Sequence, residues 1–223
     1  MRHWISKAAT GLAGLLLCAA LQAPAGAQAE GMAENALIAQ SGNATCVGTL
    51  PAGQYINVTV PANTTCTLDQ NHRIFADLRV EPGATLWATS VYVEANLVSF
   101  GSIYATDIRV GGNAHLSPTS SGAPSFVVGS SIGANLELRG GAGGFRLEQT
   151  VVGGNVRLLD VDPSGTYGAD LVANDRIGGQ LESTNRFSIR VEGTTVGGSL
   201  VCHNFAPSWL GGGNIIGGQT SCP

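Results

Sequence analysis

Aspartates make up the densest group of residues in this chain that could carry out chemistry. Asp160, Asp162, Asp170 and Asp175 fall within one short stretch. Carboxylates held close together can act as general acid and base on a glycosidic bond, or can bind calcium beside a polysaccharide. The cluster therefore predicts a candidate catalytic site made of Asp160, Asp162 and Asp170. The competing interpretation, which we favour, is a solvated turn, because Asp162 begins Asp-Pro-Ser-Gly, an ordinary β-turn sequence.

Other reactive residues lack the spacing of a catalytic or metal site. His72, His115 and His203 are far apart in the sequence and do not have metal-ligand spacing. The sequence therefore predicts no cofactor and no metal. Aromatic residues give a weaker signal, since sugar-binding faces favour exposed rings, although core or loop packing explains most of them. The candidates for outward-facing rings are Trp87, Tyr92, Tyr104, Tyr167 and Trp209.

A repeat must position all of these residues. The segment Val152-Gly-Gly-Asn-Val-Arg-Leu158 recurs in related form from positions 110, 132, 177, 196 and 216, and weaker copies start near 54, 74 and 91. Units of about 20 residues without helical periodicity suit one turn, or coil, of a parallel β-helix. The sequence thus predicts an all-β protein: a single right-handed parallel β-helix of about nine coils, with about 20 residues per coil.

Residues at equivalent positions of successive coils should stack in columns, roughly 4.8 Å apart. The fifth and seventh positions of the recurring seven-residue segment are almost all apolar, and the sixth is almost all polar. This alternation predicts that side chains at the fifth and seventh positions point into the solenoid and that those at the sixth point outward. The outward Glu137, Arg157 and Glu182 could form an alternating ion ladder. A second inward column is predicted from Leu86, Ile103, Phe126, Phe145, Leu171, Phe187 and Leu210.

The fourth position predicts a polar ladder. Stacked amides can donate to one neighbour and accept from the other, so such a column satisfies its own hydrogen bonds. The preceding glycine pair is expected to give the backbone the freedom to turn a corner. The ladder comprises Asn113, Asn135, Asn155, Gln180, Ser199 and Gln219, preceded by Asn57, Asp77 and Glu94.

The same stacking predicts how four cysteines pair. Cys202 and Cys222 occupy one column in consecutive coils, and Cys46 and Cys66 are also 20 residues apart. Adjacent strands place Cα atoms near 5 Å, which is within the range of disulfides. We therefore predict disulfides Cys46–Cys66 and Cys202–Cys222, which clamp the two end coils.

The N-terminal residues have the pattern of an export signal. Arg2, His3 and Lys7 precede an apolar run that ends in two Ala-x-Ala sites, which predicts a signal peptide over residues 1–29. Residues 30–44 would be an N-terminal segment, either a short helix over the first coil or a flexible tail, and residues 45–223 the β-helix domain. No later segment is long and apolar enough to span a membrane. The sequence predicts a secreted protein, periplasmic or extracellular.

Charge argues against one class of partner. Removal of the signal leaves 9 Lys and Arg against 15 Asp and Glu, a net charge of −6. An acidic chain with scattered arginines is a poor candidate for binding a phosphate backbone, so nucleic acid is set aside. A carbohydrate or a cell-envelope component is the expected kind of partner.

The residues also carry a resemblance. Cys46-Val-Gly-Thr-Leu-Pro-Ala-Gly, Val58-Thr-Val-Pro-Ala-Asn, the Gly-Gly-Asn units and the final Cys222 resemble a group of bacterial secreted right-handed parallel β-helix proteins with Gly-Gly-Asn coils and terminal cysteine pairs. The resemblance implies an exported β-helix but no activity. A more distant similarity is to bactofilins, polymerising β-helices that lack paired cysteines.

Three hypotheses follow for the function. The first is a secreted, non-catalytic structural or binding β-helix of the envelope or extracellular space. The second is a polysaccharide-active enzyme or carbohydrate-binding protein of pectate-lyase-like architecture. The third is a self-assembling, bactofilin-like filament.

Overall fold

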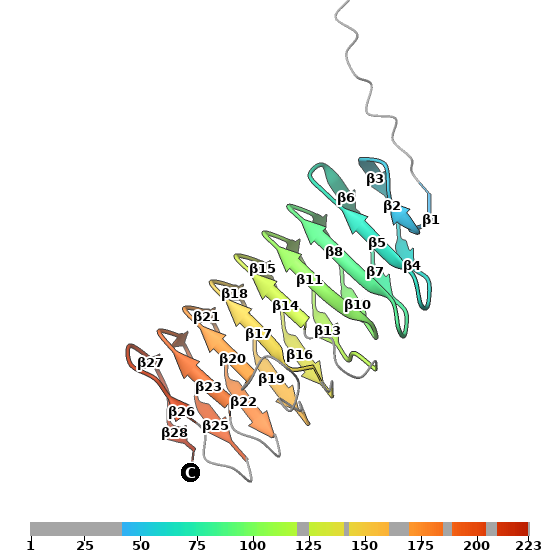
Figure 1. Cartoon of the computed structure of the whole chain (residues 1–223). Coiled ribbons are helices and arrows are strands. Elements are labelled where there is room, and N and C mark those ends of the chain that lie inside the picture. The colour runs from blue at the N-terminus through green and yellow to red at the C-terminus, as the bar shows by residue number, and fades with distance from the viewer. Residues whose placement is uncertain are drawn as a thin grey trace, which may run out of the picture. The chain divides into compact units, whose positions relative to one another are not determined.

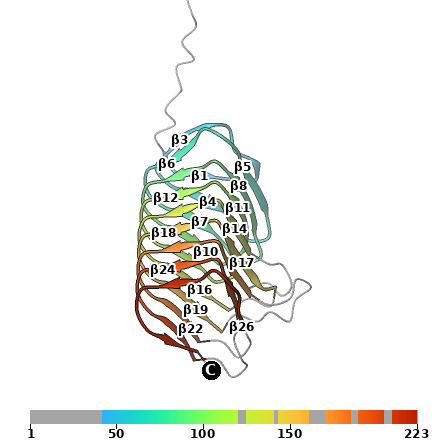
Figure 2. The ribbon, with the colours of Figure 1, turned by 90° about the vertical axis from the view of Figure 1, so that its left-hand side faces the viewer.

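The computed structural model describes residues 42–119, 125–140, 143–160, 170–184, 189–203 and 209–222. These residues form a parallel β-helix whose coils each contribute one strand to three sheets (Figure 1). In the turned view of Figure 2 the coils follow one another from β3 (Gly53–Tyr55) to β28 (Thr220–Ser221), and the three sheets form the walls of one continuous solenoid. The predicted fold class is therefore confirmed. The signal peptide proposed for residues 1–29 lies outside the described residues, as does nearly all of the segment 30–44.

The strands are short and regular, and each sheet takes every third strand in order. Sheet A contains β1 (Ala44–Thr45), β4 (Val58–Val60), β7 (Leu78–Val80), β10 (Leu97–Ser99), β13 (Ala114–Leu116), β16 (Leu136–Arg139), β19 (Val156–Leu159), β22 (Leu181–Thr184), β25 (Leu200–Cys202) and β28 (Thr220–Ser221). Sheet B contains β2 (Gly48–Thr49), β5 (Thr65–Leu68), β8 (Thr85–Thr89), β11 (Ser102–Thr106), β14 (Ser125–Val128), β17 (Phe145–Glu148), β20 (Asp170–Ala173), β23 (Ile189–Glu192) and β26 (Trp209–Leu210). Sheet C contains β3 (Gly53–Tyr55), β6 (His72–Ile74), β9 (Tyr92–Val93), β12 (Arg109–Val110), β15 (Ser131–Ile132), β18 (Val151–Val152), β21 (Arg176–Ile177), β24 (Thr195–Val196) and β27 (Ile215–Ile216).

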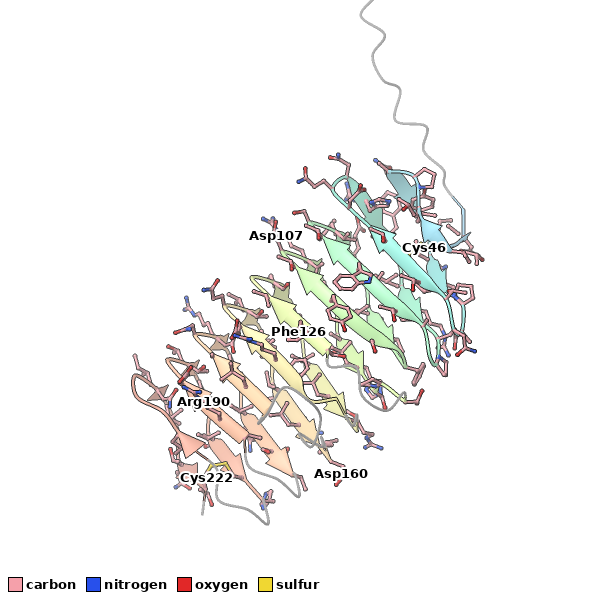
Figure 3. All side chains as sticks on the ribbon, in the orientation of Figure 1. Cys46, Asp107, Phe126, Asp160, Arg190 and Cys222 are labelled. Atoms are coloured by element: carbon pink, nitrogen blue, oxygen red, sulfur yellow. A yellow bond between two sulfur atoms is a disulfide. The ribbon has the colours of Figure 1, made fainter. Side chains whose placement is uncertain are left out.

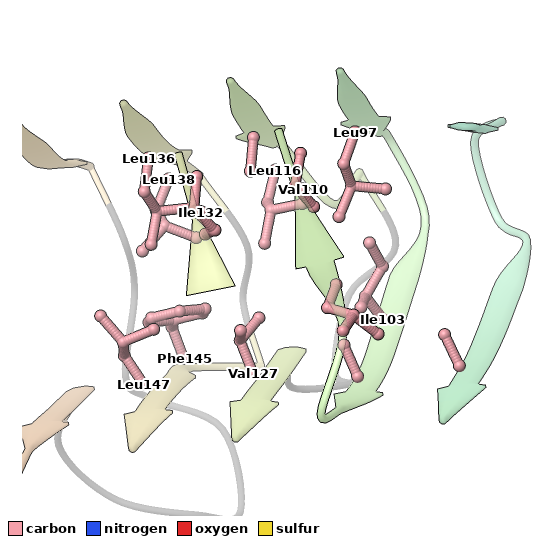
Figure 4. Close-up of a cluster of buried hydrophobic side chains, with 14 of the residues drawn as sticks. Leu97, Ile103, Val110, Leu116, Val127, Ile132, Leu136, Leu138, Phe145 and Leu147 are labelled. Atoms are coloured by element: carbon pink, nitrogen blue, oxygen red, sulfur yellow. The ribbon is translucent and has the colours of Figure 1, made fainter. Parts of the chain in front are cut away.

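Alternation along each strand fills the interior. In β19, for example, Val156 and Leu158 are fully buried while Arg157 between them is exposed. Side chains from all three sheets meet in one core, which Figure 4 shows around Leu116, Ile132 and Leu147. Because this core is continuous along the solenoid, each coil depends on its neighbours for burial of its apolar face.

One coil follows a different register from the predicted one. Leu97 stacks between Leu78 and Ala114, so Leu97 occupies the fifth position, whereas a ladder residue at Glu94 required Ala95 in that position. The ladder residue of this coil is consequently Asn96, not Glu94. The physical reason is the hydrogen bonding at the corner: the amide N–H of Asn96 donates to Asp77, and its side-chain oxygen accepts from the N–H of Asn113.

The second inward column was partly wrong. Leu86, Ile103 and Phe145 are buried in it as predicted, but Phe126 and Leu171 stack on the outer face of sheet B. Leu210 lies in the next inward column of sheet B, beside Val191. Phe187 is outside the described residues. The inward neighbours of Phe126 are Ser125 and Val127, which are both buried. The loop before β14 is longer than the one before β11, so spacing alone misplaced the register by one residue and exchanged the two faces.

The corner between sheets B and C requires a left-handed backbone. At this corner one residue of each coil after the first has a positive φ: Asn71, Ser90, Asp107, Gly129, Gln149, Asn174, Gly193 and Gly213. Glycine, asparagine and aspartate adopt this conformation at the lowest cost, which explains their frequency here.

The Gly-Gly corner between sheets C and A uses glycine for a different reason from the predicted one. No positive φ occurs at Gly153 or Gly154, but a Cβ on either residue would collide with the backbone of the preceding coil. Close approach of stacked backbones, rather than an unusual conformation, excludes a side chain from Gly153.

Both predicted disulfides are present. The Cα atoms of Cys46 and Cys66 are 5.5 Å apart, and those of Cys202 and Cys222 are 4.6 Å apart. Each bridge joins consecutive coils at one end of the solenoid. Cys202 and Cys222 share a column of sheet A, whereas Cys46 follows β1 in sheet A and Cys66 lies in β5 of sheet B, beside Gly48. The end coils have a neighbour on one side only among the described strands, so a covalent link there opposes fraying.

Removal of the C-terminal bridge is expected to loosen the last coil. A bridge across 20 residues should contribute about 3 kcal/mol to the free energy of unfolding. The Cys202→Ser/Cys222→Ser variant should therefore lose about this amount in urea unfolding, and the amides of β26–β28 should exchange hydrogen faster than those of β16–β18. Equal exchange in the parent and the variant would contradict a clamping role.

Candidate functional site

The structure separates one aspartate, Asp175, from the rest of the acidic cluster. Asp160 is exposed after the end of β19, at the corner between sheets A and B, whereas Asp175 is buried at the opposite corner, between sheets B and C. Asp170 begins β20, and Asp162 lies outside the described residues. The placement of Asp175 in a surface patch was therefore wrong.

Asp175 belongs instead to a buried polar column that the sequence analysis missed. The amide N–H of Thr150 donates to the carboxylate of Asp175 at 2.7 Å, and the N–H of Thr194 donates to the side-chain oxygen of Asn214 at 3.0 Å. Ser130 takes the same place two coils before Asp175. Each side chain satisfies a backbone donor of the preceding coil, so the column has a structural role.

Burial makes the carboxyl group of Asp175 a weaker acid than an exposed aspartate. Its second carboxylate oxygen, Oδ2, is buried and has no hydrogen-bond partner among the described residues. Loss of hydration raises the pKa of Asp175 to about 7, against the opposing effect of the hydrogen bond from Thr150. An inaccessible carboxyl cannot reach a polymeric substrate, so we do not assign Asp175 a catalytic role.

The amide ladder of sheet A forms one wall of a groove of about 370 Å³. The side-chain oxygen of Asn113 accepts from both the backbone N–H and Nδ2 of Asn135, each at 3.2 Å. Asn155 repeats this arrangement on Asn135, and Gln180 and Gln219 continue it through their backbone N–H groups. The predicted ladder is thus present, with backbone donors as its main partners.

Charged side chains beside this groove have partners within the protein. Arg157 pairs with Glu182 at 3.1 Å, as the predicted ion ladder required. Glu137, however, lies beside His115 at 3.5 Å and Arg139 at 3.7 Å. Exposed pairs of this kind contribute little to stability.

Sheet B carries the most unusual surface. Trp87, Tyr104 and Phe126 occupy the same outward column of three consecutive coils. The rings of Trp87 and Tyr104 are stacked with centroids 4.0 Å apart and planes 8° apart, and Phe126 follows at 5.5 Å with a 33° tilt. Figure 3 shows Phe126 on this face, with Arg190 farther along the same column. We call Trp87, Tyr104 and Phe126 the aromatic stripe.

Trp87 offers an open ring face at one end of the stripe. One face stacks on Tyr104, and the residue in the same column of the preceding coil is Thr67, which is too small to cover the other face. Trp87 is 48% exposed, although an indole is costly to leave in water. Thr85 and Thr89 flank it on the same strand, so hydroxyl groups surround the open face.

The strand pattern could have revealed most of this face. Thr85-Leu-Trp-Ala-Thr89 and Ser102-Ile-Tyr-Ala-Thr106 are matching five-residue segments with buried Leu86, Ala88, Ile103 and Ala105. Period-two alternation then places Trp87 and Tyr104 outside. The outward position of Phe126 depends on the register after a longer loop, and that register required the structure.

The described residues contain no group of three or more His, Cys, Asp or Glu side chains suited to a metal ion. In the same part of the chain, no helix has the length and apolarity needed to cross a bilayer. The chain matches no family model, no curated protein and no solved structure.

Proposed function

We propose that this protein is an exported, non-catalytic β-helix that binds polysaccharide through the aromatic stripe on sheet B. The observation that carries the proposal is the stacked, outward column of Trp87, Tyr104 and Phe126, in which Trp87 is exposed and the other two rings are half-buried. Sugar rings have apolar C–H faces that pack on aromatic side chains, and their hydroxyl groups bond to polar neighbours such as threonine. The open ring face of Trp87, with Thr85 and Thr89 on the same strand, matches both requirements.

The scaffold also supports a polymeric ligand. The stripe extends along the solenoid at one ring per coil, from β8 and β11, the two longest strands of sheet B, to β14. Those strands are fixed on both sides by neighbouring coils, so the rings are already positioned before binding. A ligand that meets a pre-ordered surface loses less free energy to the ordering of that surface.

Charge pairing on sheet B favours binding over catalysis. Arg190 pairs with Glu192 at 2.7 Å, and Arg146 pairs with Glu148 in the same i, i+2 arrangement. The glutamates nearest the stripe are thus held by arginines of their own strand. Export is supported by the two disulfides, which form in oxidising compartments, and by the signal-like N-terminal sequence.

Replacement of Trp87 by alanine tests the proposal. Because the substitution removes the open ring face, we expect binding to soluble polysaccharide to weaken by at least about tenfold. Affinity electrophoresis through gels that contain the polymer measures this loss. Phe75→Ala is the matched control: Phe75 is an exposed aromatic residue (38% exposed) outside the stripe, and its loss should leave the affinity unchanged.

The alternative functions give different results in the same samples. An enzyme that used Asp160, Asp162 or Asp170 would release reducing ends, and release would stop in Asp160→Ala. A filament would scatter more light as protein concentration rises without any polymer. If no polysaccharide in a broad panel retards the protein, or if Trp87→Ala binds as well as the parent, the proposed function is wrong.

A further inference from the structure

A groove of about 420 Å³ adjoins the strands that carry the aromatic stripe, at the corner between sheets B and C. It is lined by Ser90, Val91, Tyr92, Asp107 and Arg109. The same two coils supply both features: one runs from Trp87 through Thr89 to Tyr92, and the next from Tyr104 through Thr106 to Arg109. Figure 3 shows Asp107 at this corner. A ligand on the stripe that extends past the threonines would enter the groove.

Arg109 differs from the other arginines in this part of the chain. Of the eight arginines in the described residues, six form an ion pair with a glutamate, and only Arg109 and Arg176 have none. A guanidinium offers five N–H donors in a fixed plane. Arg109 lines the groove, and its guanidinium forms no ion pair with a carboxylate of the described residues.

Asp107 supplies the complementary acceptor. It is two residues before Arg109 and exposed, and the positive φ of 53° at Asp107 places it at the tight corner. Its carboxylate accepts one hydrogen bond, from the hydroxyl of Ser90 at 2.9 Å. A carboxylate can accept several more. Although both groups line the groove, no ion pair joins Asp107 to Arg109, so each retains hydrogen-bonding capacity.

We propose that the groove of Ser90, Tyr92, Asp107 and Arg109 extends the binding face and selects a neutral polysaccharide with adjacent hydroxyl groups. The inference rests on the proposed function. Asp107 accepts from hydroxyl hydrogens, Arg109 donates to hydroxyl oxygens, and the ring of Tyr92, which is 40% exposed, provides apolar contact. One carboxylate beside one guanidinium matches the paired donor and acceptor character of neighbouring sugar hydroxyls.

The charges around the groove favour a neutral polymer over an acidic one. Arg73 lies over the ring of Tyr92 at 5.6 Å, but its charge is paired with Glu94 at 2.7 Å. Asp107 offsets the charge of Arg109. The groove therefore has no excess positive charge to attract a uronate polymer, and Asp107 would repel its carboxylates.

The experiment compares neutral polymers (a soluble β-glucan, galactomannan and dextran) with acidic ones (alginate and polygalacturonate). The parent protein should bind at least one neutral polymer, and its affinity should change less than about twofold between 50 and 500 mM NaCl because no net charge is screened. Arg109→Gln and Asp107→Asn should each weaken that binding by about tenfold, the usual effect of losing a hydrogen bond to a charged group. Asparagine also tolerates the left-handed conformation at residue 107.

Arg176→Gln is the matched control, because Arg176 lies on sheet C in the same column as Arg109, three coils away, and also lacks an ion pair. If Arg109→Gln behaves like Arg176→Gln while Trp87→Ala still abolishes binding, the groove has no role but the stripe does. Preferred binding of alginate or polygalacturonate, weakened by salt, would overturn the neutral specificity. Absence of any binding would contradict the proposed function itself.

Discussion

At pH 8 the Asp175→Asn variant is expected to resist urea better than the parent protein, whereas near pH 4 the two are expected to unfold at similar urea concentrations. Burial raises the pKa of Asp175 from 3.8 to about 7. Between these values the folded protein holds a proton that the unfolded chain has released. The free energy of unfolding of the parent should therefore fall as pH rises from about 4 to 7. The full loss is on the order of 4 kcal/mol.

Asparagine suits this site because it has no charge to desolvate. Its side-chain oxygen can accept from Thr150 as the carboxylate does, and Asn214 shows that an amide fits this column, where its Nδ2 donates to the carbonyl oxygens of Val191 and Gly211. Asp160→Asn, at an exposed aspartate, should not change the pH dependence. Parallel stability curves for Asp175→Asn and the parent from pH 4 to 8 would show that Asp175 is not protonated in the folded state.

The Gly153→Ala variant is expected to lose about 3 kcal/mol of stability or more. A Cβ at Gly153 would press on the carbonyl oxygen of Gly133 and lie 3.1 Å from its carbonyl carbon. Backbone atoms cannot rotate away, so the two coils must separate. Separation would strain the hydrogen bonds from Gly153 N–H to Ile132 and from Asn155 N–H to Asn135. Thermal unfolding should show a midpoint lower by roughly 6–12 °C.

Gly212→Ala provides the comparison. A Cβ there would meet no atom within 4 Å, and Gly212 does not have a positive φ. Its melting temperature should stay within about 2 °C of the parent. If Gly153→Ala melted as late as Gly212→Ala, glycine at this corner would not be required by the close approach of stacked backbones.

The two proposed ligand-contacting features depend on the solenoid in the same way. A stacked Trp87–Tyr104 pair requires adjacent coils in register, and the groove requires the corners of the same coils to align Ser90 with Asp107. A local change that separated these coils would weaken both. Variants should therefore be checked for folding by circular dichroism before any loss of binding is assigned to a single side chain.

Sequence reasoning succeeded where the repeat was unbroken. From Val110 onward the Gly-Gly-Asn segments fixed the register of sheet A, and the spacing of Cys202 and Cys222 gave the disulfide correctly. It failed at Glu94 and Asn96, where the corner lacks the glycine pair and a shift of two residues preserves the alternation of apolar and polar positions. It also failed at Phe126, because a loop of different length separates sheets A and B in that coil.

The sequence by itself determined the period, the inward and outward faces of sheet A, and the pairing of Cys202 with Cys222, because stacked strands translate equal spacing into contact. Only the tertiary structure decided that Asp175 is buried, that Phe126 joins Trp87 and Tyr104 outside, and that Asp107 and Arg109 share a groove. Those outcomes depend on how each corner turns the chain from one sheet to the next. Corner geometry arises from contacts between coils, which the residues of a single coil do not specify.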